Sequence, residues 1–146
     1  HVTSPDPAAT WHVKAMQLAI GQAGLEAAGP GIDAVVAHGT GTRLGDAAEI
    51  RAINAVFGTR AEKLRVTSIK GHIGHSAGAA GVMSLIAGLA SMEQGALVPT
   101  ANTRKVDPEA RFRVVVKKPA PGPIAAVQIN AFGFGGQNAS LVVVRE

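Results

Sequence analysis

The sequence predicts an α/β fold in which two strands share one parallel sheet and each is followed by a helix. Residues 32–37 have the pattern of a strand, and a glycine-containing turn leads from them into a helix over residues 46–57. The same pattern recurs with a strand over 64–69 and a helix over 82–94. Strands that alternate with helices in this way are typical of parallel sheets.

The second helix follows four glycines within residues 71–81 and is expected to be the core element. Between residues 71 and 92 there is no Asp, Glu, Lys or Arg. Because a helix that is hydrophobic all round is buried, we expect this one to have no solvent face and to lie inside other structure.

The composition favours one compact domain or part of a larger one. The 146 residues are 47% hydrophobic and include no cysteine, so disulfides and thiolate metal sites are excluded. The longest apolar stretch, residues 77–90, is interrupted by glycines and a serine, and it is shorter than the ~20 residues that span a bilayer. We therefore expect a soluble, cytoplasmic protein without a membrane partner.

The formal net charge is +4, and basic residues gather in the last third of the chain. Aromatic residues, which would stack on bases, make up only 3% of the sequence, so a solvated basic face is favoured over a nucleic-acid site. The residues of this face are Arg104, Lys105, Arg111, Arg113, Lys117 and Lys118.

Helical spacing of alanines predicts a first helix over residues 11–28, which the Gly-Pro-Gly of residues 29–31 would end. The proline-rich residues 1–10 carry no core signal. In the second predicted helix, Asp46 and Glu49 have the spacing of a capping box, and for Asp46 this reading is favoured over a direct functional role.

The C-terminal part contains three further β-type runs. A short one covers residues 112–116, and residues 117–123 (Lys-Lys-Pro-Ala-Pro-Gly-Pro) form a loop. Residues 124–130 and 141–145 are predicted strands, which residues 131–138 connect.

Histidines stand directly after both strands of the parallel pair. His38 follows the first strand, and Lys70, His72 and His75 lie in the turn after the second. Because sites in open α/β sheets form beyond the carboxyl ends of strands, His38 and His75 are expected to converge on one pocket. His72 is interpreted as a structural residue of the turn.

Three motifs stand in order along the chain. They are His-Gly-Thr-Gly-Thr at residues 38–42 with Gly-Asp-Ala-Ala-Glu at 45–49, Lys-x-x-x-Gly-His-x-x-Gly-Ala-Ala-Gly at 70–81, and Asn-Ala-Phe-Gly-Phe-Gly-Gly-Gln-Asn at 130–138. Together they resemble the β-ketoacyl-acyl-carrier-protein synthases. The resemblance covers residues 1–146, but only the C-terminal half of such an enzyme.

The resemblance implies the C-terminal half of a thiolase-like fold, a mixed sheet with helices around a buried central helix. The family performs decarboxylative Claisen condensation of an acyl thioester with malonyl-acyl carrier protein in fatty acid or polyketide biosynthesis. Its nucleophilic cysteine would lie in an N-terminal half outside this chain. The implied partners are acyl carrier protein, that half and a second subunit, as a homo- or heterodimer.

By match to the motifs, His38 and His75 are the catalytic histidines that stabilise the enolate. Lys70 and Glu49 match a catalytic lysine and its acidic neighbour. Glu49 is either part of a helix cap or the partner of Lys70, and we expect Lys70 and Glu49 to be in contact, with both near His75.

The resemblance also implies residues that bind substrate. Thr40 and Thr42 match the threonines that contact the pantetheine arm of the carrier protein, which is the only cofactor-like group expected. Phe134 matches a gating phenylalanine whose backbone N–H contributes to the oxyanion hole.

The chain departs from the common family pattern at Ser84, where many fatty-acid-type members carry Glu, and at Ala131 and Gln137. The acyl substrate therefore stays open. Two alternatives also remain. One is a metal site of His38, His72 and His75, and the other is a non-catalytic chain-length or scaffold subunit that pairs with an active ketosynthase.

Overall fold

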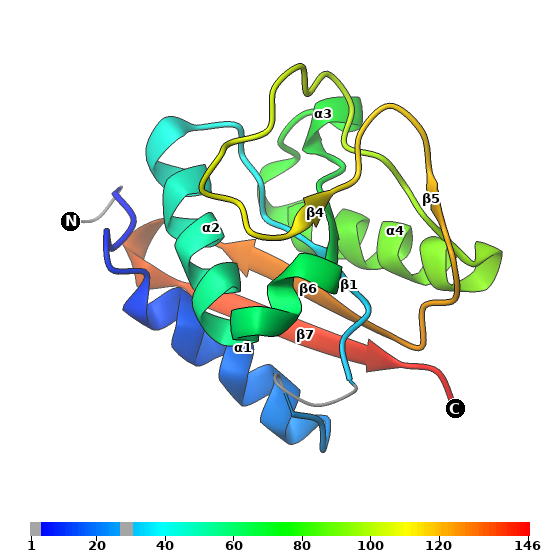
Figure 1. The fold of residues 1–146 in the computed structure, drawn as a ribbon. Helices are drawn as coiled ribbons and strands as arrows, with labels where there is room; N and C mark the ends of the chain where they lie inside the picture. The colour runs from blue at the N-terminus through cyan, green and yellow to red at the C-terminus, as the bar shows by residue number, and fades with distance from the viewer. Residues whose placement is uncertain (1–3, 27–30) are drawn as a thin grey trace.

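The computed structural model describes residues 4–26 and 31–146, which form a mixed five-stranded sheet between helices (Figure 1). The strand order is β4-β2-β1-β6-β7. β1 pairs in parallel with β2 and with β6, β2 pairs in parallel with β4, and β6 pairs with β7 in antiparallel fashion. The predicted parallel pairing of the first two strands is therefore confirmed. The strands are β1 (Ala34–Val36), β2 (Arg65–Thr67), β4 (Arg113–Val114), β6 (Ala126–Phe132) and β7 (Asn138–Val144).

Three longer helices cover the sheet. α1 (Thr10–Gln22) and α2 (Arg43–Phe57) lie on one face, and α4 (Ala80–Gln94) lies on the other (Figure 1). Shorter elements connect them: η1 (Gly58–Lys63), α3 (Lys70–Ile73), η2 (Ala77–Ala79), η3 (Phe134–Gly136), and a small antiparallel pair of β3 (Ala96–Leu97) and β5 (Ala120–Pro121). None of the described helices is long and apolar enough to cross a membrane.

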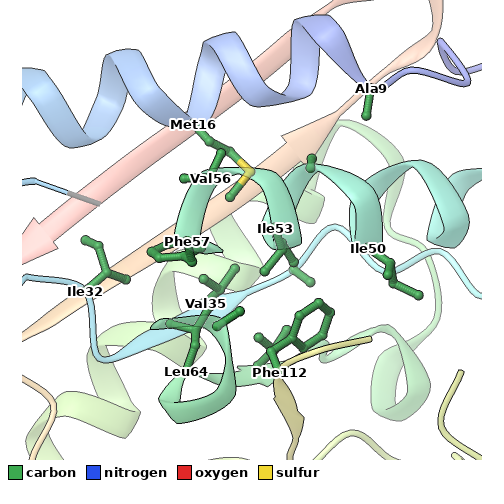
Figure 2. Packing of buried hydrophobic residues seen from close by; sticks show 14 of the residues in the cluster. Ala9, Met16, Ile32, Val35, Ile50, Ile53, Val56, Phe57, Leu64 and Phe112 are labelled. Carbon is green, nitrogen blue, oxygen red and sulfur yellow. The ribbon is translucent and has the colours of Figure 1, made fainter. Parts of the chain in front are cut away.

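Side chains of β1 alternate between two cores. Val35 packs into the cluster of α1 and α2 with Met16 and Ile53, as Figure 2 shows, whereas Ala34 and Val36 pack with the residues around α4. All three β1 residues are 0% exposed. This is the expected consequence of a parallel strand that helices cover on both sides.

The expectation that α4 has no solvent face is wrong for this chain. Ser84, Gly88 and Met92 are buried against the sheet, and Gly88 lies close enough that an added Cβ would be 3.5 Å from side-chain atoms of Val127 and Ile129. A flat sheet covers only one stripe of a helix. The outer stripe is therefore open, with Val82, Met83, Ile86 and Leu89 at 58, 37, 54 and 46% exposed.

The boundaries of the two other long helices differ from the prediction. α1 ends at Gln22, where the chain turns through Gly24 at φ 69°, and the predicted stop at residues 29 and 30 lies outside the described residues. α2 begins at Arg43, so Asp46 is not its N-cap. Asp46 lies in the first turn, where its Oδ1 accepts the N–H of Gly41 at 3.1 Å.

The segment before α1 takes part in the core, contrary to the sequence interpretation. The carboxylate of Asp6 accepts the N–H groups of Ala8 at 3.0 Å and Thr10 at 2.9 Å. These bonds hold Ala9 at φ 57° and bury it completely. Aspartate favours such a turn because its side-chain carboxylate can accept backbone N–H groups a few residues further along the chain. In the same way, β5 lies within residues 117–123, which were predicted as a loop only.

Candidate active site

The carboxyl ends of three neighbouring parallel strands carry the candidate residues. His38 follows β1, α3 with Lys70 follows β2, and η3 with Phe134 follows β6. The rings of His38 and His75 lie 5.5 Å apart between centroids and nearly perpendicular, at 81°. The predicted convergence of these two histidines is confirmed.

A hydrogen bond joins the turn after β1 to the turn after β2. Ser68 Oγ donates to the carbonyl of Gly39 at 3.1 Å, and Gly39 adopts φ 43°. A Cβ on Gly39 would lie 2.6 Å from Cβ of Ser68. Because no side chain fits there, glycine is required after His38, and the turn that carries His38 stays against the end of β2.

Lys70 determines the hydrogen-bonding state of His38. Its Nζ donates to the carbonyl of His38 and lies 3.4 Å from His38 Nδ1. Since an ammonium group has no acceptor, Nδ1 must accept and the ring proton resides on Nε2. Burial, and after it the charge of Lys70, lowers the pKa of His38 from 6.5 to about 4. His38 is therefore a neutral donor at physiological pH.

His75 is held in the same tautomer by a different contact. Its Nδ1 accepts the N–H of Ala77 at 3.1 Å. This bond places the imidazole proton on Nε2, as in His38. His75 is exposed, and it lies in the segment between α3 and η2. The two rings thus present two Nε2–H donors at one end of the sheet.

The carboxylate of Glu49 binds the backbone of the turn that carries His38, and it does not bind Lys70 directly. It is 4% exposed, its Oε1 accepts the N–H of His38 at 2.9 Å, and its Oε2 accepts the N–H of Gly39 at 2.7 Å. Burial raises the pKa of Glu49, and these donors oppose that rise. The expected direct contact between Lys70 and Glu49 is wrong, because the two groups bind opposite ends of the His38 backbone.

Charge still couples Lys70 to its acidic neighbours. Burial lowers the pKa of Lys70, whereas the carboxylates of Glu49 and Asp46 act in the opposite direction. A half-buried ammonium group between hydrogen-bond acceptors and carboxylates keeps its charge at lower cost than an isolated one.

Thr40 and Thr42 present a pair of hydroxyl groups at the start of α2. Their Oγ1 atoms are 2.9 Å apart. A Cβ on Gly45 would lie 2.5 Å from the hydroxyl oxygen of Thr42 and 2.9 Å from that of Thr40. The glycine therefore permits both hydroxyls to gather over the first turn of α2.

Phe134 is 75% exposed in a turn that contains two glycines with positive φ, Gly135 at 75° and Gly136 at 79°. The phenylalanine that contacts the histidine is Phe132, whose ring centroid is 6.0 Å from that of His38. Phe132 also meets the buried ring of His12, with 4.2 Å between the ring centroids. The sequence analysis did not single out His12 or Phe132 as site residues.

Asn130 is a second residue that the sequence analysis did not assign to the site. It is 1% exposed, and its Nδ2 donates to Glu49 Oε1 at 3.1 Å. A polar residue at every second position of a strand, as at 128 and 130, is the signal that could have indicated it.

A cavity of about 840 Å³ adjoins the site. Lys70, His75 and Glu49 line it on one side, and the segment of residues 100–108 lines it on the other. Arg104 and Lys105, which were assigned to a solvated face, also lie on its wall.

His72 makes a different contact from the other two histidines. Its Nε2 is 2.7 Å from the carbonyl of Pro99, which fits the structural role expected for it. The described residues contain no group of three His, Cys, Asp or Glu side chains that could hold a metal ion. The three-histidine metal site is thus without geometric support.

Comparison with known proteins agrees with the motifs. The profile of the family "Beta-ketoacyl synthase, C-terminal domain" matches residues 1–104. The 3-oxoacyl-[acyl-carrier-protein] synthase 2 of Staphylococcus aureus is 36% identical over 142 residues, which are 97% of this chain and 35% of that protein.

Two solved structures share the fold over the whole chain. A beta-ketoacyl synthase from Burkholderia phymatum has a TM-score of 0.89 at 35% identity, with 100% of this chain and 34% of that chain covered. The ishigamide ketosynthase/chain length factor has a TM-score of 0.90 at 34% identity, with 100% and 35% covered. The expected thiolase-like fold is confirmed.

The chain spans about a third of the length of the relatives it matches. Within that third it carries two histidines with adjacent rings, a lysine bonded to the carbonyl of His38, and a mixed sheet. The chain therefore belongs to the β-ketoacyl synthase family, as a C-terminal domain of that family.

Proposed function

We propose that this chain supplies the histidine-bearing half of the active site of a β-ketoacyl-acyl-carrier-protein synthase. One observation carries the proposal: His38 and His75 each accept a hydrogen bond at Nδ1, so each presents an Nε2–H donor. Two Nε2–H donors with ring centroids 5.5 Å apart suit a single oxygen on which negative charge develops. The thioester oxygen of a malonyl group is such an oxygen.

The donors act when the malonyl group loses its carboxylate. The bond between the carboxylate and the methylene carbon breaks, carbon dioxide leaves, and the electron pair forms an enolate with its charge on the thioester oxygen. His38 and His75 donate to this oxygen and lower the barrier because their dipoles are oriented beforehand. The matched relative from Staphylococcus aureus is named a 3-oxoacyl-[acyl-carrier-protein] synthase, which supports this proposal.

Condensation follows in the same site. The enolate carbon attacks the carbonyl of an acyl group bound as a thioester to cysteine, and a carbon–carbon bond forms. The carbon–sulfur bond then breaks and the thiolate leaves with its electron pair. We assign this cysteine to an N-terminal half of the complete protein, since the present chain contains none. Burial and Lys70 keep His38 neutral, and Lys70 and Glu49 together hold the His38 backbone in place during both steps.

The hydroxyls of Thr40 and Thr42 would bind the phosphopantetheine arm of acyl carrier protein as it enters, a role supported by their 2.9 Å separation at the start of α2. Phe134 would form a gate, because two glycines with positive φ allow its segment to change conformation. Its backbone N–H would donate to the oxygen of the acyl group. Acyl carrier protein, the cysteine-bearing half and a second subunit of a dimer are the proposed partners.

The test requires the complete synthase with its cysteine, and decarboxylation and acyl loading are measured separately. Replacing His38 or His75 by Ala should slow the release of carbon dioxide from malonyl-acyl carrier protein by about 10²–10³-fold, the usual effect of losing one such donor. Acyl transfer to the cysteine should suffer less, since it does not pass through the enolate.

His72→Ala is the matched control. His72 lies in the same turn as Lys70 and His75, but its ring nitrogen contacts the carbonyl of Pro99. This variant should leave both steps largely unchanged. If His72→Ala abolished decarboxylation while His75→Ala spared it, the assignment of the turn would be wrong.

A second candidate function has a specific observation in its favour. One of the solved structures, at 34% identity, is named as a ketosynthase/chain length factor. A chain-length subunit would pair with an active ketosynthase without performing decarboxylation itself. The complete wild-type protein, without a partner ketosynthase, is supplied with malonyl-acyl carrier protein in excess. If it releases no carbon dioxide, this second function is favoured.

A further inference from the structure

A buried row of polar side chains leads from the middle of the sheet to His38. Gln128 and Asn130 lie two residues apart on β6, so they share one face, and they are 0 and 1% exposed. Ser140 lies opposite Asn130 on β7. Polar groups at this depth are unfavourable unless they are hydrogen-bonded.

The neighbours allow only one direction of these hydrogen bonds. The carbonyl oxygen of Met16 can only accept, so Gln128 turns its Nε2 toward it at 3.1 Å. The same Nε2 donates to Ser140 Oγ at 2.8 Å, and the hydroxyl in turn donates to Asn130 Oδ1 at 3.0 Å. Gln128 Oε1 is left without a partner among the described residues. The carboxamide of Asn130 is thus oriented with its Nδ2 away from β7.

This Nδ2 faces Glu49. It donates to Oε1 at 3.1 Å, and the same oxygen accepts the N–H of His38 at 2.9 Å. Glu49 Oε2 accepts the N–H of Gly39, and Lys70 binds the carbonyl of His38. The backbone of His38 is therefore held on both sides, and the hold on its N–H depends on how the carboxylate of Glu49 is oriented.

We propose that Asn130 is a positioning residue for His38, which acts by fixing the carboxylate of Glu49, and that Ser140 and Gln128 orient Asn130 for this task. The proposal rests on the proposed function, since it assigns Asn130 to the same site. Without Nδ2 the carboxylate keeps only its two backbone donors, so its orientation is less restricted and the N–H groups of His38 and Gly39 have a less fixed acceptor. The Nε2–H donor of His38 then no longer meets the thioester oxygen in one geometry.

The test compares Asn130→Ala with Asn54→Ala in the complete synthase. Asn54 also makes two hydrogen bonds, to the backbone of Glu109 and Arg111, but it has no link to Glu49. Asn130→Ala should lower the rate of malonyl decarboxylation by about 10–100-fold, as expected for a misplaced catalytic group. Acyl loading should change less, and Asn54→Ala should change neither rate.

Amide hydrogen exchange gives a readout that does not need activity. In Asn130→Ala the amides of His38 and Gly39 should exchange faster, whereas in Asn54→Ala they should not. Ser140→Ala removes the donor to Asn130 Oδ1 and the acceptor of Gln128 Nε2 but leaves the bond from Asn130 to Glu49 possible. It should produce a smaller change in the same direction, and it replaces Asn130→Ala in the test if that variant does not fold. If the wild-type protein does not decarboxylate malonyl thioesters, the proposed function fails, and the exchange rates still decide the role of Asn130.

A double variant separates positioning from general stability. Combined with Glu49→Ala, Asn130→Ala should add little further loss of decarboxylation, because Glu49→Ala already removes the oxygen to which Asn130 donates. Additive losses, or a lower unfolding temperature with unchanged exchange at His38 and Gly39, would overturn the proposal.

Discussion

At the scale of residues, burial and one lysine together determine the protonation state of His38. Burial and the ammonium group of Lys70 lower the pKa of His38 to about 4, and Lys70 occupies its Nδ1. A histidine in this state is neutral throughout the physiological range and donates through Nε2.

Replacing Lys70 by Met should therefore raise the pKa of His38 from about 4 toward 6.5, because the charge that opposes protonation is removed. Nuclear magnetic resonance titration of the His38 ring nitrogens in the complete protein measures both the pKa and the tautomer. Lys63→Met, which removes an exposed lysine of η1, is the control and should leave the titration of His38 unchanged. A wild-type His38 that titrates near 6.5 would contradict this account.

The same shift has a consequence for stability. The unfolded chain takes up a proton on this histidine near pH 6.5, whereas the folded protein does so only near pH 4. Stability should therefore be fully retained above pH 6.5 and should decrease as the pH falls from 6.5 to 4. This loss should be smaller in Lys70→Met, where the two pKa values lie closer, and thermal unfolding at a series of pH values measures it.

At the scale of elements, α3 and the segment after Pro99 form the wall of the cavity by close backbone contact. A Cβ on Gly71 would strike the carbonyl oxygen of Ala101, and Asn102 donates its Nδ2 to the carbonyl of Gly71 at 2.8 Å. The position of the segment therefore depends on the absence of a side chain at residue 71.

Gly71→Ala should destabilise the complete protein by about 1–3 kcal/mol, because backbone atoms cannot move aside as a side chain can. Gly21→Ala is the matched control, since nothing lies within 4 Å of a Cβ at this position in α1. It should raise stability by up to about 1 kcal/mol through helix propensity. Chemical denaturation compares the two variants, and equal effects would show that the contact at Gly71 does not matter.

At the scale of the whole molecule, the outer stripe of α4 is apolar and open. Val82, Ile86 and Leu89 are about half exposed, with no charged residue between positions 71 and 92. Contiguous exposed apolar surface of this kind marks an interface. We expect the part of the complete protein that the longer relatives possess to cover it.

The chain on its own should accordingly bind a hydrophobic dye and unfold without a sharp transition. Ile86→Glu should reduce the dye fluorescence more than Leu18→Glu, which places the same charge on α1 at a similar exposure of 57% against 54%. A cooperative, dye-excluding monomer would show that α4 needs no cover.

Local patterns sufficed for much of the fold. The strands before His38 and Lys70, their parallel pairing and the helices after them follow from apolar runs and glycine turns, which act over a few residues. The convergence of His38 and His75 followed in turn, because parallel strands place their carboxyl ends at one edge. The exact helix starts did not follow, as Asp46 shows, since a residue that can cap a helix also stabilises its first turn.

By itself, the sequence determined the family, the order of elements and the two histidines, because motifs and periodicity are local properties of the chain. Only the tertiary structure decided what holds those histidines. The link from Asn130 to Glu49 joins residues 81 positions apart, and Lys70 reaches His38 across 32. Such bonds depend on which side chains the packed sheet and helices bring within about 3 Å of one another. Local sequence patterns do not indicate which distant side chains will come that close.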